Sequence, residues 1–513
     1  MFKIKLFIAA LIFSGFSAAR EGGITNGVRI SYYVTEEQIS FADSLFDYVM
    51  TPFLNSYVRN SFTRSQLFLY RSIQGTWDSV NHFDWNYINM HENMFCHTDS
   101  TIQNLDTRIK TIWASYLMQA DDMVEPTAPD ALTHWINYYA VTASQQVYEY
   151  NYDGLYIDSA SHLLKSEWLV DGILPWNYSP QTWRIARYNS LKFIKSYFPD
   201  KTVVFNGLHS GNGADSSLSV TDGGMWEDFA FSANTGEYKG LGSWLRAINC
   251  MLKNRDSSKL ILVVKKPGLM NDLQARIFSV ASYLLVENEN TIFTASDYAY
   301  DTLLQYYPEF EIDIGNSSIE LHVNSDTLFS REFENGLVLV NPTTTESKTY
   351  NLSHGYYKIV PYGGGFVSQD GLCEGGLSYE NVSEGIIELP PISAVILQDT
   401  LTTDVEIQNS KIEFSLSQNY PNPFNPTTTI LYSIPTPSVF TRRSAMAETQ
   451  SAVKVTLIVY NTLGQKVTTL VNKAQTPGNY TVQFDASDLP SGIYFYSLQA
   501  RNFVATKKMI FIK

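Results

Sequence analysis

The sequence predicts a (β/α)8 barrel followed by an antiparallel β-sandwich and a small all-β module. From Val28 onward, short apolar segments alternate with amphipathic stretches, which is typical of βα units. Eight such repeats fit into about 280 residues, close to the roughly 250 residues of a typical barrel of this kind. After about Tyr300 the apolar residues alternate with a period of two, without a helical period. A doubly wound open sheet is the main alternative, but no Gly-x-Gly-x-x-Gly turn follows the first strand.

The composition indicates a folded protein of several domains and argues against some partners. The 513 residues are too many for one compact core, and 44% hydrophobic with 17% charged residues is typical of folded chains. A net charge of −15 argues against nucleic acids and anionic membranes, because phosphate binding needs a basic surface. The aromatic content of 14% fits a cleft for sugars, but Tyr-rich sheets of a secreted protein would give the same value.

The three cysteines lack the spacing of a metal site. Cys96, Cys250 and Cys373 lie far apart, so one disulfide is possible, although buried free thiols fit the spacing better. The sequence contains no His-x-x-x-His, Cys-x-x-Cys or P-loop pattern. We therefore expect neither a metal nor another cofactor.

Residues 1–19 are predicted to be a signal peptide. Lys3 and Lys5 precede an apolar run, and Ser17-Ala18-Ala19 offers the small residues that a signal peptidase reads. The run is too short to span a bilayer comfortably. We expect export of the remainder, with no membrane-spanning segment in the mature chain.

Eight strands and five clear helices make up the predicted barrel domain, residues 20–300. The strands are expected at residues 28–33, 46–51, 67–72, 154–158, 202–206, 224–227, 260–264 and 291–295. The helices are expected at residues 36–44, 131–150, 180–197, 241–253 and 272–286.

A long insertion, residues 74–129, separates the third and fourth predicted strands and is rich in aromatic residues. Long loops at the carboxyl ends of barrel strands usually build the binding cleft. Trp113 and Tyr116 are therefore candidate substrate-binding residues, although we expect most aromatic residues of the insertion to be structural.

The remaining chain predicts two β domains joined by a linker. Alternating runs such as residues 336–340 and 385–389 indicate a β-sandwich over residues 301–398. The polar stretch 399–411 is typical of a linker. Residues 412–513 begin with many turn formers and end in four alternating segments, 453–460, 478–485, 492–500 and 507–512, which indicates a small all-β module.

Two carboxylates at the ends of barrel strands form the candidate catalytic pair. Asp158 ends the fourth predicted strand and Glu227 ends the sixth. An acid at the end of a buried strand is costly unless it is paired or takes part in chemistry. The carboxyl ends of barrel strands form the active-site face. Carboxylates about 5–5.5 Å apart are what retaining hydrolysis of a glycosidic bond requires. By contrast, Asp153 precedes its strand, so we expect it at the opposite end of the barrel, where it stabilises the fold.

Further polar and aromatic residues near these strand ends are candidates for substrate binding: Arg71, Asn206, Trp226 and Lys265. The acid of a catalytic pair needs a raised pKa, and burial beside Trp226 would raise the pKa of Glu227.

Three alternatives stay open. The two carboxylates could form ion pairs with Arg71 or Lys265 and merely close the barrel end. Asn206 could cap the next loop, and a shift of one residue would replace Glu227 by Asp228.

The C-terminal module resembles the type A sorting domain of the type IX secretion system. The residues that carry this resemblance are 418–428 (QNYPNPFNPTT), 459–467 (VYNTLGQKV), 489–496 (LPSGIYFY) and 507–509 (KKM). Residues 436–451 depart from the pattern as an insertion with Arg442 and Arg443. The resemblance implies an Ig-like fold, recognition by the type IX machinery, and a protein that is secreted or anchored at the outer cell surface.

Residues from about 28 to 398 resemble a group of hypothetical glycoside hydrolases numbered fifteen and, more distantly, the superfamily of α-galactosidases and endo-α-1,4-polygalactosaminidases. The residues that carry it are 153–158 (DGLYID), 113–118 (WASYLM) and the segment around Glu227. In that superfamily the nucleophile lies on the fourth strand and the acid/base on the sixth. By position, Asp158 would be the nucleophile and Glu227 the acid/base.

Together these observations predict a secreted or cell-surface glycoside hydrolase that acts on a poly- or oligosaccharide, with retention. The alternative is a catalytically inactive barrel that serves as a surface glycan-binding or structural protein.

Overall fold

The computed structural model describes most of the chain after the N-terminal segment. The described residues are 24–30, 34–52, 56–76, 85–100, 107–113, 115–211, 213–297, 303–323, 327–399, 415–416, 419, 422, 424–434, 453–475, 478–500 and 503–513. The predicted signal peptide, the predicted linker and the insertion at residues 436–451 lie outside them, apart from residue 399. The chain divides into two compact units, Met1–Thr400 and Leu401–Lys513.

The first unit contains an eight-stranded parallel barrel, as the sequence predicts. Its strands follow one another in chain order: β1 (Gly27–Arg29), β2 (Tyr48–Thr51), β3 (Gln66–Ser72), β6 (Gly154–Asp158), β7 (Thr202–Asn206), β8 (Gly223–Trp226), β9 (Lys259–Lys265) and β10 (Thr291–Ser296). A parallel bridge between Asn26 and Phe293 brings the last strand back to the first. Every predicted barrel strand is present, so the predicted fold class is confirmed.

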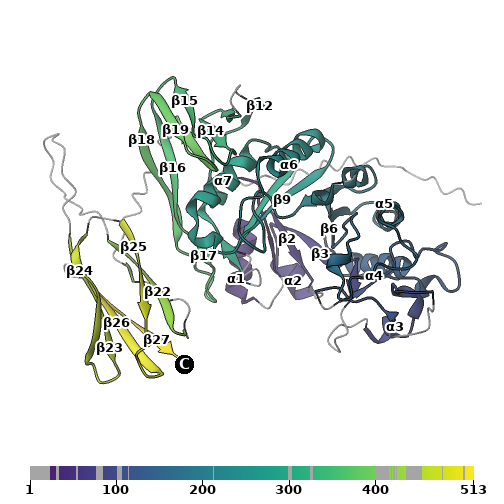
Figure 1. Cartoon of the computed structure of the whole chain (residues 1–513), viewed down its shortest axis with the longest axis horizontal. Coiled ribbons are helices and arrows are strands. Elements are labelled where there is room, and N and C mark those ends of the chain that lie inside the picture. Colours follow the sequence, from purple (N-terminus) through teal and green to yellow (C-terminus); the bar gives the residue numbers. More distant parts are fainter. Residues whose placement is uncertain are drawn as a thin grey trace, which may run out of the picture. The chain divides into compact units, whose positions relative to one another are not determined.

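Helices surround the barrel strands (Figure 1). They are α1 (Glu36–Leu45), α2 (Ser56–Ser61), α4 (Trp135–Glu149), α5 (Pro180–Lys195), α6 (Leu241–Asn254) and α7 (Leu273–Leu284). Thr35, Ser179 and Asp272 accept hydrogen bonds from the first turns of α1, α5 and α7 and so fix where these helices begin. Helix α4 begins four residues later than predicted, because Asp122 caps it by accepting the backbone N–H of Trp135 at 2.7 Å.

The long insertion between β3 and β6 holds short elements only: β4 (Gly75–Thr76), α3 (Trp85–Asn89) and β5 (Tyr116–Leu117). Strands β4 and β5 pair with each other in antiparallel fashion.

Successive side chains of each barrel strand alternate between the barrel interior and the helices. On β6, Leu155 and Ile157 belong to the core shared with the helices, whereas Tyr156 belongs to the core inside the barrel. The same alternation places Met225 of β8 inside and Trp226 outside. The position of a residue within its strand therefore decides whether it can reach the end of the barrel cavity.

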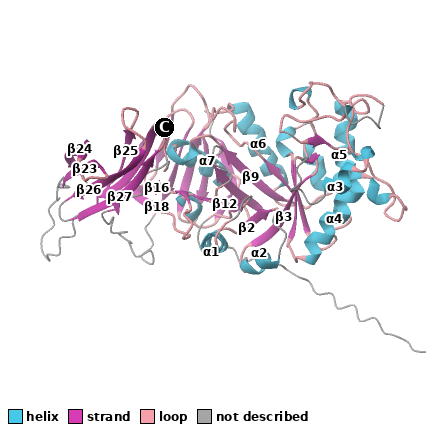
Figure 2. Cartoon of the chain, turned by 90° about the horizontal axis from the view of Figure 1, so that it is seen from below, coloured by secondary structure: helices cyan, strands magenta, loops and turns pink. Residues whose placement is uncertain are grey.

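An antiparallel β-sandwich follows the barrel and packs against α7. Its larger sheet has the order β12 (Ser317–Val323), β13 (Phe329–Phe333), β14 (Gly336–Asn341), β20 (Ser393–Gln398), β16 (Tyr356–Gly363) and β18 (Gly375–Val382), and β15 (Lys348–Leu352) pairs with β19 (Gly385–Leu389). Val338 and Val340 of β14 share the core of the barrel and its helices, whereas Leu337 and Leu339 form a second core with β15 and β19. Figure 2 shows that the helices belong to the barrel part and that strands dominate the rest.

The second unit is all-β with its own core. It consists of a three-stranded sheet, β21 (Ser415–Leu416), β22 (Thr427–Ile434) and β25 (Gly478–Asp485), and a four-stranded sheet in the order β24 (Lys466–Gln475), β23 (Val453–Asn461), β26 (Gly492–Ala500) and β27 (Phe503–Phe511). The turn-rich stretch before β22 is hydrogen-bonded to the neighbouring strands β26 and β27 of the four-stranded sheet. The Asn419 N–H donates to the Tyr496 hydroxyl at 2.6 Å, and Asn422 Oδ1 accepts the Ile510 N–H at 2.8 Å.

Among the described residues, no helix combines the length and the apolar character that crossing a bilayer would need.

Candidate active site

Five side chains at the carboxyl ends of the barrel strands reach the same end of the barrel. They are Tyr70, Asp158, Asn206, Glu227 and Lys265. Each follows by two residues a side chain that belongs to the core inside the barrel. These core residues are, in the same order, Phe68, Tyr156, Val204, Met225 and Val263. The strand register places the strands that carry them side by side. The alternation of the strands thus brings the candidate pair to one cavity.

Asn206 links the two carboxylates directly. Its Nδ2 atom donates to Asp158 Oδ1 at 2.8 Å and to Glu227 Oε2 at 2.7 Å. Because both acceptor oxygens lie within 2.8 Å of one nitrogen, they can be no farther apart than about twice that distance. Asn206 is buried, so water competes little for these hydrogen bonds.

Tyr70 holds the other oxygen of Asp158. Its hydroxyl group donates to Asp158 Oδ2, and its ring stacks on Tyr156 with a centroid distance of 5.6 Å. The guanidinium group of Arg29 lies 4.4 Å from the centroid of the Tyr70 ring. Burial, followed by the charge of Asp158, raises the pKa of Tyr70 well above its usual range, so the hydroxyl group remains a donor.

Glu227 forms an ion pair with Lys265 through Oε1. Burial alone would raise the pKa of Glu227, but the charge of Lys265, the nearby His209 and the hydrogen bonds from Asn206 and Lys265 outweigh it and lower that pKa to about 2. The expectation of a raised pKa for Glu227 is therefore wrong. The neighbouring Asp228 differs, because burial and the charge of Glu227 raise its pKa to about 6.

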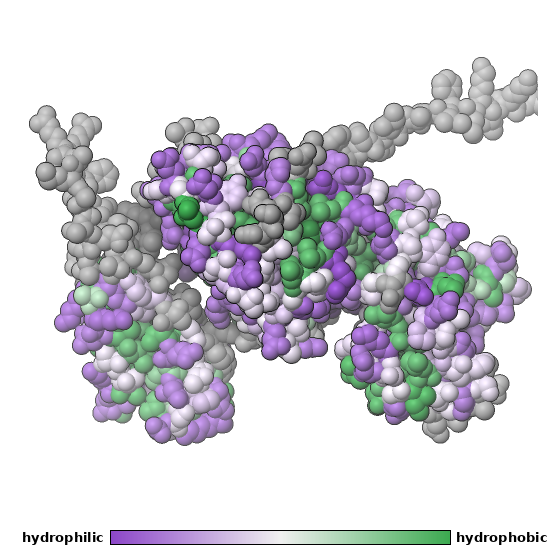
Figure 3. All heavy atoms as spheres, turned by 45° about the horizontal axis from the view of Figure 1, so that its top comes forward, coloured by the Kyte–Doolittle hydropathy of each residue, from purple (hydrophilic) through white to green (hydrophobic). Residues whose placement is uncertain are grey.

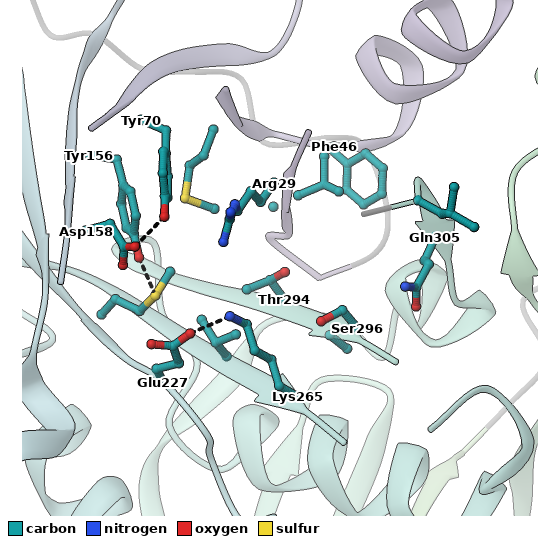
Figure 4. Close-up of a pocket in the computed structure, with 17 residues that line it drawn as sticks. Arg29, Phe46, Tyr70, Tyr156, Asp158, Glu227, Lys265, Thr294, Ser296 and Gln305 are labelled. Atoms are coloured by element: carbon teal, nitrogen blue, oxygen red, sulfur yellow. Dashed lines mark hydrogen bonds and ion pairs between the residues drawn. The ribbon is translucent and has the colours of Figure 1, made fainter. Parts of the chain in front are cut away.

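Tyr70, Asp158, Glu227 and Lys265 line one pocket, drawn in Figure 4. Asp158 and Tyr70 lie on one side, and Glu227 with Lys265 lies on the other. The remaining polar lining residues are Arg29, Tyr156, Thr294, Ser296 and Gln305. Glu227 lines the pocket and Asp228, whose backbone has a left-handed φ of 55°, is not among the lining residues. Within the described part of the chain, no three His, Cys, Asp or Glu side chains gather as a metal site would need.

Four residues that the sequence nominated for substrate binding lie elsewhere. Arg71 points to α4, where it donates to Gln146 Oε1 at 2.9 Å, and Trp226 is buried in the core between strands and helices. Tyr116 is half-buried and stacks on Trp85 at 5.6 Å within the insertion. Trp113 is exposed and contacts Trp168. Arg71 and Trp226 face the helices because each follows an inward residue by one position.

Tyr70 and Arg29 are pocket residues that sequence reasoning did not single out. Tyr70 lies two residues after the inward Phe68, so counting along β3 would have found it. Arg29 ends the very short β1, where no such alternation could be read.

We expect replacement of Lys265 by methionine to destabilise the fold by about 2 kcal/mol at pH 7, because it leaves a largely buried carboxylate without its partner. The pKa of Glu227 lies below its ordinary 4.5, so its pairing stabilises the wild type above about pH 4.5, and this contribution is lost as the pH falls towards 2. In Lys265→Met, burial raises the pKa of Glu227, and the destabilisation shrinks on acidification.

Urea unfolding between pH 3 and pH 8 measures this difference. Lys266→Met is the matched control, because Lys266 pairs with the half-exposed Asp272 at 2.9 Å and its loss should cost at most about 1 kcal/mol. A loss of stability in Lys265→Met that does not change with pH would contradict the proposed role of the ion pair.

Two family models match the chain. The model of hypothetical glycosyl hydrolase family 15 matches residues 61–337, which is more than half of the chain. The model of the secretion system C-terminal sorting domain matches residues 418–513. Both resemblances read from the sequence are therefore confirmed. No curated protein sequence matches the chain.

Several solved structures are similar to the chain. The glycoside hydrolase domain of PelA from Pseudomonas aeruginosa has 15% sequence identity, and the match covers 54% of this chain and 97% of that domain with a TM-score of 0.37. An alpha-amylase from Geobacillus thermoleovorans has 9% identity, with 74% and 98% coverage and a TM-score of 0.38. A GH36 alpha-galactosidase from Geobacillus stearothermophilus has 9% identity, with 74% and 56% coverage and a TM-score of 0.38.

Proposed function

Because the chain belongs to hypothetical glycosyl hydrolase family 15, we propose that it hydrolyses the glycosidic bonds of a poly- or oligosaccharide with retention of configuration. The C-terminal sorting domain marks the protein for type IX secretion and for anchoring at the cell surface. The substrate is then a glycan that the protein meets outside the cell.

One observation supports the retaining mechanism above all others: the hydrogen bonds of Asn206 to both carboxylates. They keep the nearest oxygens of Asp158 and Glu227 within about 5.5 Å of each other, which supports the close approach of the two carboxyl groups, about 5–5.5 Å, that retaining enzymes need. An inverting enzyme needs about 6.5–9.5 Å, so that a water molecule fits between the sugar and the base.

Asp158 is the proposed nucleophile. One of its oxygens forms a bond to the anomeric carbon while the bond from that carbon to the leaving oxygen breaks, and Glu227 gives its proton to the leaving oxygen. Water then attacks the glycosyl–Asp158 ester, gives one proton back to Glu227, and restores both groups. Asn206 and Tyr70 hold the nucleophile in place through its two oxygens.

Glu227 must be protonated to act as the acid, although its ion pair with Lys265 lowers its pKa. A bound sugar that displaces the Lys265 ammonium group from Oε1 removes the main cause of the low pKa and leaves burial, which raises it. The displaced ammonium group becomes a donor for a sugar hydroxyl or carboxylate group. In this proposal Lys265 therefore couples substrate binding to the protonation of Glu227.

The stereochemistry of the first product tests the mechanism. We expect proton NMR of an early time course to show the product sugar in the same anomeric configuration as the substrate bond, before mutarotation. Initial formation of the opposite anomer would exclude Asp158 as a nucleophile. No release of reducing ends from any glycan tested would favour the inactive, glycan-binding barrel instead.

A further inference from the structure

Two tryptophan side chains lie against each other at the surface, outside the catalytic pocket. Trp113 belongs to the insertion between β3 and β6, and Trp168 belongs to the loop between β6 and α5. Their ring centroids are 6.0 Å apart and their planes are tilted by 54°. Trp113 is 54% exposed and Trp168 is half-buried. Neither is among the residues that line the pocket of Asp158 and Glu227.

The backbone fixes this pair in place. Thr111 and Leu169 form an antiparallel bridge. The Ile112 N–H donates to the Trp168 carbonyl oxygen at 2.9 Å, and the Val170 N–H donates to the Lys110 carbonyl oxygen at 2.9 Å. The two segments that carry the indole rings are therefore joined by their backbones, so less chain has to be ordered when a ligand binds.

Exposed apolar side chains accumulate on the same two segments. Ile112, Val170, Ile173 and Trp176 are all at least half exposed. Figure 3 shows hydrophobic residues at the surface of the lobe on the right, which contains α3, α4 and α5 in Figure 1. Apolar side chains that gather at the surface of a folded protein mark a site of interaction.

The pair lies on the same end of the barrel as the catalytic pocket. Both segments belong to loops that leave the carboxyl ends of their strands, β3 and β6. The loop with Trp168 starts directly after Asp158, the last residue of β6. Both loops that carry the tryptophans therefore start at the end of the barrel where Asp158 and Glu227 lie.

Polar groups accompany the rings as a sugar would require. The Lys165 ammonium group lies 5.1 Å from the centroid of the Trp168 ring and 3.0 Å from Glu167 Oε1. Indole faces stack on the C–H faces of pyranose rings, and the ammonium and carboxylate groups beside them can hydrogen-bond to hydroxyl groups.

We propose that Trp113 and Trp168 form a second glycan-binding site, separate from the pocket, that holds the polysaccharide while one of its bonds is cleaved at Asp158 and Glu227. This proposal rests on the proposed function for the choice of a glycan as the ligand. Since the site contacts sugar units away from the cleaved bond, it acts on long chains and not on small substrates.

Affinity electrophoresis of the full chain tests the site. Native gels containing dextran, laminarin, xylan, galactomannan, pectin or glycol chitosan serve as probes, and the Asp158→Asn background prevents cleavage. We expect at least one probe to retard this protein and the double variant Trp113→Ala/Trp168→Ala to bind it about tenfold more weakly. Trp113→Tyr should keep most of the binding, because an aromatic face remains. Leu372→Ala, which removes an exposed apolar side chain from the β-sandwich, should change nothing.

Kinetics in the wild-type background separate this site from the proposed function. The double variant should raise KM for the retarding polysaccharide about tenfold, with kcat unchanged, and leave the hydrolysis of an aryl glycoside unaltered. Equal retardation of the double variant and its parent in every gel, or no retardation of either, overturns the second site. If the double variant loses retardation but the wild type cleaves none of the probes, the second binding site stands and the proposed hydrolase activity is wrong. Light scattering that shows a dimer which the double variant abolishes would assign the surface to self-association.

Discussion

Replacement of Asp158 by asparagine is expected to lower kcat on the natural glycan on the order of 10⁴-fold or more, because the amide cannot form the glycosyl ester. The substitution keeps the size of the side chain: its amide oxygen can still accept from Asn206, and the Tyr70 hydroxyl group can turn to accept from its amide nitrogen. The fold should therefore survive, and glycan binding should remain measurable. Release of reducing ends, together with circular dichroism of the variant, provides the measurement.

Asp153→Asn is the matched control for this variant. Asp153 lies just before the other end of β6, where its carboxylate accepts the Leu67 N–H at 2.8 Å and lies 3.7 Å from Arg59. We expect this change to lower stability by about 1 kcal/mol and to leave kcat unchanged. An Asp158→Asn protein that folds and retains full activity would remove Asp158 from the mechanism.

Replacement of Glu227 by glutamine is expected to lower kcat about 10²- to 10⁴-fold on substrates with a poor leaving group, since these need the proton most. On an aryl glycoside with an acidic phenol, the loss in the first step should be much smaller. The variant should also lose the dependence of activity on pH that comes from Glu227. Steady-state rates with a series of aryl glycosides measure this change in leaving-group sensitivity.

Asp228→Asn decides between the two neighbouring acids. Asp228 does not line the pocket, so we expect this variant to keep most of the activity, although burial and Glu227 raise the pKa of Asp228 to about 6. If Asp228→Asn lost most of the activity, Asp228 and not Glu227 would be the acid. If the rate of Asp158→Asn, and not that of Glu227→Gln, depended strongly on the leaving group, Asp158 would be the acid and Glu227 the nucleophile. The low pKa of Glu227 would fit that exchange, because a nucleophile must be ionised.

The secondary structure of the barrel could be predicted because each strand is a short apolar run bounded by polar residues. The predicted strands 154–158 and 202–206 coincide with β6 and β7, and the bounds of the others differ by at most a few residues. The first strand is the least well predicted, since β1 ends at Arg29 and the structure does not describe residues 31–33. The start of α4 was missed because its cap, Asp122, is distant in sequence.

The sequence alone indicated that Asp158 ends its strand and that Glu227 lies at the end of its own, where the structure has it one residue past β8, and it also indicated the family and the sorting domain. Strand-end position does not say which way a side chain points, so Arg71 and Trp226 were nominated although they face the helices. Only the tertiary structure joined Asp158, Asn206 and Glu227 by hydrogen bonds and set Lys265 against Glu227. The physical reason is that the pKa of a buried carboxylate and its distance from a second one depend on neighbours from other strands. Those neighbours meet only when the barrel closes.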